Sequence, residues 1–270
     1  MKYQNEFKCI DTQEKAYFLG QAFGDGCNTI TKKYRFTMAS INTDTELYKK
    51  LQELFPFLKL KTYASHSNMI YLESHDRNFC LDLAALGLVS PKTKNDETKE
   101  FHFPNLNKEF LPHFIRGYFD ADGSAWYPKR YRSRNNLHIE FGCSTPNFLE
   151  DINKILIENG IKFTNKSREK KAGNGKYYKS YILYSASYKL SKKFANFIYS
   201  NASIYLSYKY DSCYRKKIDM PPTMHELYGN CIYCGSENLH RQQIRMMKHG
   251  PMQRIKCVDC NRSFSVPLPK

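Results

Sequence analysis

The sequence predicts an α+β fold made of two pseudo-symmetric αββαββα units, each with a saddle-shaped antiparallel sheet, followed by a small cysteine-containing module. Three observations predict it. An apolar run that ends in Asp-Gly at residues 18–26 returns in the middle of the chain, at residues 115–123. Each run is followed by the same order of expected strands and helices. The chain then ends with a region that holds two Cys-x-x-Cys pairs.

Small residues on the two repeated runs predict that they form helices packed closely together. Gly20 and Gly24 lie four residues apart and share one helix face, as Gly117 and Ala121 do in the second run. A glycine inside a helix costs about 1 kcal/mol relative to alanine, so a pair on one face needs a compensating contact. The close approach of two helix backbones supplies that contact.

Each run ends in an acid, Asp25 in the first and Asp122 in the second. The helix dipole disfavours negative charge at a helix C-terminus. If the helices are parallel and side by side, both carboxylates lie at the same end and call for a cation. An oxygen donor set favours a hard ion such as Mg²⁺, or Mn²⁺ in its place. The alternative is two ordinary helices that end in Asp-Gly turns, and the presence of two copies, each before a hairpin pattern, argues against it.

The two runs resemble the motif of the LAGLIDADG homing endonucleases in their single-chain, two-motif form. The second run is close to the family pattern, whereas Gln21 and Phe23 stand in the first run where the family has a leucine and an acid. The terminal Asp-Gly is intact in both runs. The resemblance covers residues 12–217.

The resemblance implies a site-specific double-strand DNA endonuclease of intron homing, which hydrolyses phosphodiester bonds with divalent metal ions. It implies a metal-binding set of two carboxylates and two preceding carbonyls: Asp25, Asp122, Gly24 and Ala121. The family also has a basic residue late in each half, near the phosphates. We choose Lys92 and Lys209 for that role, with an ordinary surface lysine as the alternative for each.

The charge of the chain indicates a polyanionic partner. Its 42 basic and 26 acidic residues give a net charge of +16, which fits nucleic acid, although a merely basic protein is the alternative. No apolar run approaches the ~18 residues that a membrane span needs. The polar first residues lack a signal-peptide core. We therefore expect an intracellular protein.

In the first half, a helix is expected from about Thr12 to Asp25, then a hairpin at residues 27–41. Thr43 is expected to open a second helix, with Glu46 completing a capping box. A second hairpin at residues 59–63 and 69–73 and a third helix at residues 76–86 follow. Residues 87–103 are expected to connect the halves.

In the second half, the motif helix ends at Asp122, and a hairpin at residues 124–143 carries a very basic tip. A helix from Pro146 is expected to end at Gly160. A second hairpin at residues 161–184, a helix around Phe194 and a last helix at residues 203–217 complete the unit. We expect domains at 1–105 and 106–217, a linker at 218–229 and a terminal module at 230–270.

Basic residues alternate with others on the expected strands, which places them on one face of each sheet. Strands can enter the major groove and read base edges, while solvated sheet faces are the alternative. The expected DNA contacts are Arg35, Lys59, Lys61, Lys129, Arg130, Arg132, Arg134, Lys162, Lys166 and Arg168.

The terminal module is expected to be a zinc ribbon. Cys231, Cys234, Cys257 and Cys260 have the spacing of two metal-binding knuckles, and four thiolates can surround Zn²⁺ tetrahedrally. So small a module depends on its metal to fold. Residues 253–264 also resemble the zinc ribbons near DNA-binding parts of transposases. Basic side chains suit an added DNA contact, with support of folding or a protein partner as alternatives: Arg241, Arg245, Lys248, Arg254, Lys256 and Arg262.

The remaining candidates have simpler interpretations. Trp126 is expected to pack in the core or on its strand, and Asp120 to be a polar residue at the helix end. Five of the nine cysteines lie singly, which fits a reducing compartment such as bacterial cytoplasm or nucleoid, or an organelle.

The competing function is a cleavage-inactive LAGLIDADG DNA-binding regulator or an intron RNA maturase. The unusual first motif favours this alternative, and the retention of both acids argues against it. An intein is disfavoured because the chain starts with methionine and ends in Pro-Leu-Pro-Lys, without a His-Asn junction. We expect a monomer that binds double-stranded DNA, with intron RNA as a further partner in the maturase alternative.

Overall fold

A computed structural model describes residues 2–31, 33–90, 101–128, 136–171, 175, 177–214, 224–247 and 250–268, with only the backbone of Asn42. The chain divides into two compact units. Unit 1 takes in Met1–Pro128 and Asn136–Tyr214, and unit 2 contains the described residues from Met224 onward. Among the described residues, no helix is both long and apolar enough to cross a membrane.

The first half of unit 1 has the expected order of helices and strands. Its elements are α1 (Gln13–Asp25), β1 (Gly26–Thr29), β2 (Arg35–Ile41), the 3-10 turn η1 (Asn42–Asp44), α2 (Thr45–Leu54), β3 (Lys59–Tyr63), β4 (His66–Ser74) and α3 (Arg77–Ala85). The strands form one antiparallel sheet in the order β1-β2-β4-β3. Thr12 caps α1 by accepting from the Lys15 N–H, and Asp76 caps α3.

The expected capping box at Thr43 is wrong. Helix α2 begins two residues later, at Thr45, and Asp44 occupies its N-cap position without a side-chain cap bond. The Asp44 carboxylate is already engaged, because it accepts hydrogen bonds from the hydroxyls of Ser40 and Thr43. A 3-10 turn therefore takes the place of the first helical turn.

The second half of unit 1 repeats this order. Its elements are the 3-10 turn η2 (Lys108–Phe110), α4 (Leu111–Asp122), β5 (Gly123–Trp126), β6 (His138–Cys143), α5 (Pro146–Glu158), β7 (Thr164–Lys171), β8 (Tyr177–Ser185), α6 (Tyr188–Tyr199) and α7 (Ser207–Tyr214). The sheet order β5-β6-β8-β7 matches that of the first sheet, strand for strand. The α+β fold with two pseudo-symmetric units is thereby confirmed.

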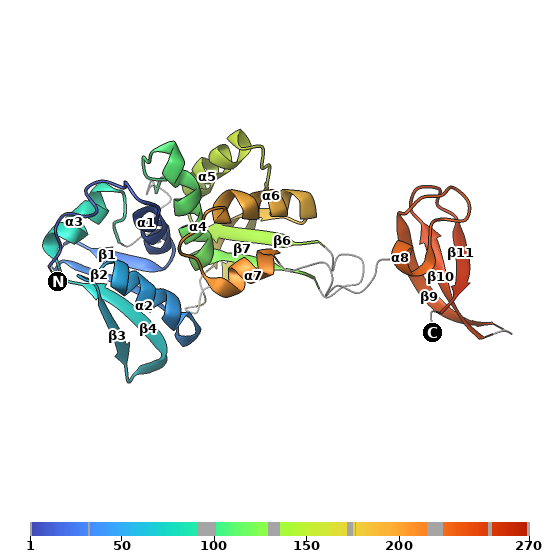
Figure 1. Cartoon of the computed structure of the whole chain (residues 1–270), viewed down its shortest axis with the longest axis horizontal. Helices are drawn as coiled ribbons and strands as arrows, with labels where there is room; N and C mark the ends of the chain where they lie inside the picture. The colour runs from blue at the N-terminus through green and yellow to red at the C-terminus, as the bar shows by residue number, and fades with distance from the viewer. Residues whose placement is uncertain are drawn as a thin grey trace. The chain divides into compact units, whose positions relative to one another are not determined.

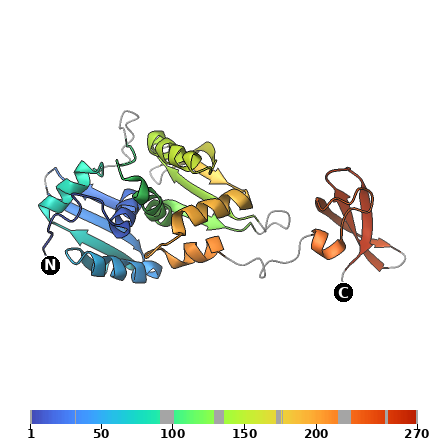
Figure 2. The same cartoon turned by 45° about the horizontal axis from the view of Figure 1, so that its top comes forward.

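Helices α1 and α4 lie side by side between the two sheets (Figures 1 and 2). A Cβ atom on Gly20 would lie 2.0 Å from the Phe114 carbonyl oxygen, and one on Gly117 would lie 2.0 Å from that of Tyr17. One on Gly24 would meet the Ala121 Cβ at 2.4 Å. Contact positions advance together along both helices, so the helices are parallel, and they approach as closely as the glycine spacing predicts.

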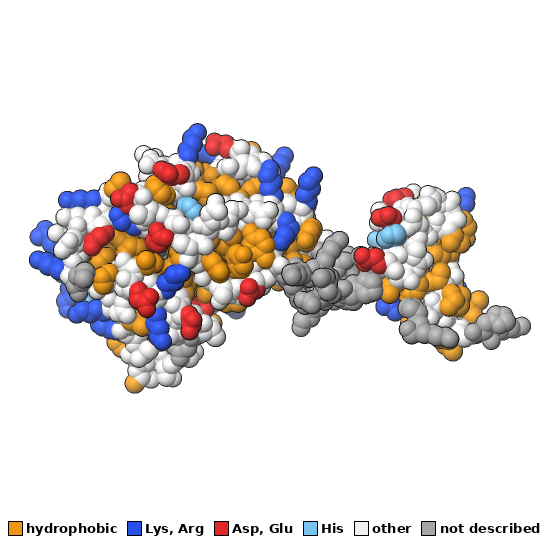
Figure 3. Space-filling view, viewed as in Figure 1, with side chains coloured by type: hydrophobic (Ala, Val, Ile, Leu, Met, Phe, Trp, Pro, Cys, Tyr) orange, Lys and Arg blue, Asp and Glu red, His pale blue; other side chains and the backbone are white. Residues whose placement is uncertain are grey.

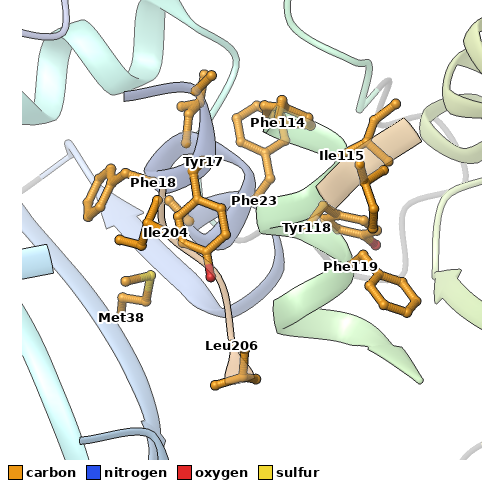
Figure 4. Close-up of a cluster of buried hydrophobic side chains, with 14 of the residues drawn as sticks. Tyr17, Phe18, Phe23, Met38, Phe114, Ile115, Tyr118, Phe119, Ile204 and Leu206 are labelled. Carbon is orange, nitrogen blue, oxygen red and sulfur yellow. The ribbon is translucent and has the colours of Figure 1, made fainter. Parts of the chain in front are cut away.

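The core of unit 1 fills the space between the helices and one face of each sheet. Alternate strand residues point into it, such as Phe36 and Met38 on β2 and Ile139 and Phe141 on β6. Figure 4 shows the aromatic side chains of α1 and α4 in this core, with the Tyr17 ring directed toward the segment that carries Leu206. The opposite face of each sheet is left for polar side chains.

Unit 2 is a small three-stranded sheet with a short helix. It contains α8 (Met224–Tyr228), β9 (Leu239–Met247), β10 (Gly250–Cys257) and β11 (Ser263–Pro267), in the sheet order β11-β10-β9. Its core is six buried residues: Met224, Cys231, Leu239, Ile255, Cys257 and Phe264. Helix α8 falls inside the segment expected as a linker, and its Met224 packs into this core.

Candidate active site and metal centre

The two motif aspartates lie at the same end of the packed helices. Helix α1 ends at Asp25 and helix α4 at Asp122, and in each case the next glycine starts a strand. The Asp122 Oδ2 atom lies 3.4 Å from the position that a Cβ of Gly24 would take, so this carboxylate reaches across to the backbone of α1. The residues before the two acids, Gly24 and Ala121, face each other across the helix interface.

Each aspartate opens onto its own hollow. Asp122 lines a hollow of about 370 Å³ together with Glu140, Arg168 and other residues of the second sheet. Asp25 lines one of about 280 Å³ together with Asp44 and Tyr208. The pseudo-symmetry of the fold thus extends to two separate spaces, one beside each acid.

The donor atoms at this end of the helices fit a hard divalent cation. Two carboxylates and the carbonyls of Gly24 and Ala121 offer only oxygen, which Mg²⁺ prefers over softer ligands. The Ala121 carbonyl already accepts a hydrogen bond of 3.2 Å from Lys209. A carbonyl oxygen has two lone pairs, so one remains for a metal ion.

Lys209 is buried beside the end of α4 and is not a surface residue. Its Nζ donates to the carbonyls of Phe119 at 3.0 Å, Asp120 at 2.5 Å and Ala121 at 3.2 Å. Burial lowers the pKa of Lys209, and nearby aspartates, Asp120 and Asp25 foremost, act in the opposite direction. The ammonium therefore caps the negative end of the helix that carries Asp122. Lys92 lies outside the described residues.

The prediction that Asp120 is simply a polar residue at the helix end is wrong. Its side chain is buried and accepts from the hydroxyls of Tyr17 at 2.9 Å and Tyr199 at 2.6 Å, and from the Leu206 N–H at 2.8 Å. Burial raises the pKa of Asp120 to about 6, even though these hydrogen bonds act to lower it. Asp120 thus ties α4 to α1, α6 and the segment before α7.

The first motif has a phenylalanine where the second has Asp120. Phe23 packs against the rings of Phe101, Phe114 and Phe148, with centroids 5.1 to 5.8 Å away. An acid there would be surrounded by apolar rings, so the departure of the first motif from the family pattern follows from its environment. The difference between Phe23 and Asp120 was the sequence signal for this asymmetry.

The cations predicted to bind DNA differ in their surroundings. Strand β7 is exposed along its length, and it carries Lys166 and Arg168, with exposed Lys162 two residues before its start. Arg168 pairs with Glu140 at 2.7 Å. In the view of Figure 3, Lys and Arg lie mainly around the margins of unit 1, and hydrophobic side chains are exposed across its centre. Four predicted contacts lie outside the described residues: Lys129, Arg130, Arg132 and Arg134.

Two cations of the first sheet are paired, which sequence reasoning missed. Arg35 and Lys61 each contact Glu73 at 2.7 Å, while Lys59 is exposed on the same strand as Lys61. Burial of Glu73 raises its pKa, but hydrogen bonds from Lys61, Tyr63 and Arg35 outweigh burial and bring it to about 2. These two cations therefore carry an internal counter-charge.

The four cysteines of unit 2 converge. Their Sγ atoms lie within 4.8 Å of one another, with 3.6 Å between Cys231 and Cys260 and 3.7 Å between Cys234 and Cys257. A tetrahedral zinc with Zn–S distances of about 2.3 Å places its sulfurs about 3.8 Å apart. The cluster fits a structural zinc site, as the spacing of the four cysteines predicts.

A family model described as the LAGLIDADG-like domain matches residues 109–198, from η2 to the last turn of α6. Two curated relatives are probable translation initiation factors IF-2, from Thermococcus kodakarensis, 26% identical over 150 residues, and Methanocaldococcus jannaschii, 26% identical over 161 residues. These alignments cover 54% and 58% of this chain and 12% of each relative, so the chain spans a small part of their length.

Two solved structures of homing endonucleases are similar to the chain. Mesophilic variants of I-DmoI are 16% identical, with a TM-score of 0.46, over 70% of this chain and 96% of theirs. I-AabMI bound to uncleaved DNA is 15% identical, with a TM-score of 0.46, over 73% of this chain and 86% of its own.

Proposed function

We propose that this chain, which carries a LAGLIDADG-like domain over residues 109–198, is a site-specific endonuclease that cleaves double-stranded DNA with a divalent cation. One observation carries the proposal. The parallel packing of α1 and α4 brings Asp25 and Asp122 to the same end of the helix pair, with separate hollows beside them. Two acids so placed suit the hydrolysis of two phosphodiester bonds, one in each strand.

The residues have distinct proposed roles. Asp25 and Asp122 hold the divalent cation, with the Gly24 and Ala121 carbonyls as further ligands. Such an ion lowers the pKa of a bound water and neutralises charge on phosphate oxygens. Lys209 and Asp120 fix the end of α4 and so the position of Asp122, because both are buried and hydrogen-bonded there.

The sheets are proposed to bind the duplex. Exposed cations on β7, and Lys59 on β3, suit contacts to phosphate, which make affinity fall as salt rises. The net charge of +16 supports association with a polyanion. Residues 1–105 and 106–217 would then each bind one half of the target, in a monomer.

The terminal module is proposed to bind one Zn²⁺ through Cys231, Cys234, Cys257 and Cys260. Residues 218–229 would link it to unit 1, with α8 of this segment packed into the core of unit 2 through Met224, and residues 230–270 would form the ribbon. The small core of unit 2 supports a metal-dependent fold. The other five cysteines, which are free thiols, support a reducing compartment inside the cell.

A second candidate function is DNA binding without cleavage, or assistance to intron RNA. The hold of Lys209 on the Ala121 carbonyl favours it, because the positive charge of this ammonium repels a metal cation bound to the same oxygen. The deciding experiment incubates the full chain with a randomised duplex library and Mg²⁺ or Mn²⁺, and sequences the cut ends. Enrichment of one duplex without any cut would support the regulator, and cutting at one sequence supports the endonuclease.

A further inference from the structure

The two sheets place chemically different side chains at equivalent positions of their outer faces. In the first sheet Thr29 pairs with Arg35, and in the second Trp126 pairs with His138. Farther across the sheets, Glu73 of β4 pairs with Lys59, and Tyr184 of β8 pairs with Thr164. Lys61 and Lys166 follow two residues later on β3 and β7. The matched sets are therefore Arg35, Glu73 and Lys61 in the first sheet, and His138, Tyr184 and Lys166 in the second.

The set in the first sheet is a charged cluster of Arg35, Lys61, Tyr63 and Glu73. The Glu73 side chain is 1% exposed, whereas those of Arg35 and Lys61 are 48% and 37% exposed. Its carboxylate accepts 2.7 Å hydrogen bonds from Arg35 Nη2, Lys61 Nζ and the Tyr63 hydroxyl. A buried acid thus holds three exposed donors in place. A guanidinium has five N–H donors, so Arg35 keeps others for a partner.

The set in the second sheet is an aromatic cluster of Trp126, His138, Tyr184 and Lys166. The His138 ring lies 5.3 Å from that of Trp126 and 5.6 Å from that of Tyr184, whose hydroxyl is 2.8 Å from His138 Nδ1. Lys166 Nζ lies 4.0 Å from the centre of the Tyr184 ring. Burial and then Lys166 lower the pKa of His138, which favours its neutral imidazole. Within this cluster Trp126 remains 36% exposed.

The two clusters carry the same net charge. Two cations and one carboxylate give +1 in the charged cluster, and Lys166 alone gives +1 in the aromatic cluster. Attraction to phosphate is therefore balanced between the two clusters, and the difference lies in what each cluster can recognise. An arginine donates to the acceptors on the guanine edge, whereas apolar contact suits the methyl group of thymine.

We propose that these two clusters are specificity determinants for unlike half-sites, with Arg35 binding base-edge acceptors in one half and Trp126 making apolar contact with a base in the other. The inference rests on the proposed DNA-binding function. Thr29 and Trp126 each follow the motif aspartate of their half by the same number of residues. Four strand residues span about 13 Å. For a strand that runs along the duplex axis, at about 3.4 Å per base, the proposed contacts fall about four base pairs outward from the cut on each side.

The test selects randomised duplexes with the full chain in buffer without added Mg²⁺ or Mn²⁺, so that binding is measured without cleavage while the cysteine cluster keeps its zinc. Arg35→Ala should reduce affinity for the preferred duplex by about tenfold to a hundredfold and erase base preference in one half-site only. Trp126→Ala should erase preference in the other half-site. Lys59→Ala and Tyr177→Ala are matched controls, because both residues are exposed on sheet strands outside the clusters. Lys59→Ala should weaken all sequences equally and lower the salt slope by about one.

Glu73→Gln supplies a second measurement. It keeps the size of the side chain but removes the counter-charge, so Arg35 and Lys61 become free to contact phosphate. Affinity for unrelated duplexes should rise, the salt slope should increase by about one, and preference in the Arg35 half-site should broaden. If the parent selects one sequence and Arg35→Ala or Trp126→Ala leaves the profile of its half unchanged, the inference fails while the DNA-binding function stands. A parent that selects no sequence overturns both.

Discussion

Alanine at the helix interface tests the geometry that brings the two aspartates together. In a solvent-exposed helix, Gly20→Ala would stabilise the protein by about 1 kcal/mol through helix propensity. Here the new Cβ would lie 2.0 Å from the Phe114 carbonyl oxygen and 2.8 Å from the Tyr118 backbone nitrogen. Backbone atoms cannot rotate away, so the helices must separate by about an ångström, and overpacking of this kind costs about 1–3 kcal/mol or more. The clash outweighs the propensity gain.

Gly24→Ala differs because its obstacle is a side chain. The new Cβ would lie 2.4 Å from the Ala121 Cβ. The double variant Gly24→Ala/Ala121→Gly moves one methyl group from α4 to α1 and removes the clash. Helix propensity gained at residue 24 and lost at residue 121 is worth about 1 kcal/mol each and cancels. The free energy of unfolding of the double variant should therefore lie within about 1 kcal/mol of the parent.

Urea unfolding followed by circular dichroism measures these free energies, and cleavage of the target duplex measures the effect on the site. We expect Gly20→Ala and Gly24→Ala to unfold more easily than the parent, and the double variant to be rescued in both assays. A Gly20→Ala variant more stable than the parent, or a Gly24→Ala/Ala121→Gly variant no better than the worse single change, would refute parallel packing of α1 on α4.

Four further outcomes are expected. Asp25→Asn and Asp122→Asn should each reduce cleavage by orders of magnitude in a nicking assay, while duplex binding in a gel-shift assay changes little. Cleavage at the parental rate in both variants would contradict the metal-site assignment. Elemental analysis should find about one zinc per chain, lost together with the fold of unit 2 on chelation; a folded, reduced unit 2 without zinc contradicts this. Asp120→Ala should destabilise unit 1 by about 3 kcal/mol or more, since it leaves three buried donors unpaired; thermal unfolding at the parental temperature would disprove the network. In the folded protein the pKa of Glu73 is lowered from 4.5 to about 2. The ionised side chain therefore adds about 3 kcal/mol to the free energy of unfolding above pH 4.5, and this stabilisation is lost as the pH falls toward 2. In Glu73→Gln the free energy of unfolding should fall less steeply between pH 4.5 and 2 than in the parent. The same fall in both proteins would argue against the charged cluster.

The sequence alone determined the features that depend on regular spacing along the chain. Glycines four residues apart predicted the close approach of α1 and α4, because a helix repeats its face at that interval. Alternating basic residues predicted that Lys166 and Arg168 share one face of a strand, which is β7, because a strand repeats its face at every second residue. The spacing of Cys231 and Cys234, and of Cys257 and Cys260, predicted the cysteine cluster. In each case a fixed spacing between residues close in sequence places their side chains on the same face or at the same site.

Only the tertiary structure decided which distant groups satisfy the polar side chains. Asp120 receives hydrogen bonds from Tyr17 and Tyr199, which lie far from it in the sequence on other helices. Glu73 meets Arg35 because β4 pairs with β2, and Lys61 because β4 pairs with β3. Burial of such acids is tolerated only when donors from separate elements converge on them, and no spacing within one element encodes that convergence.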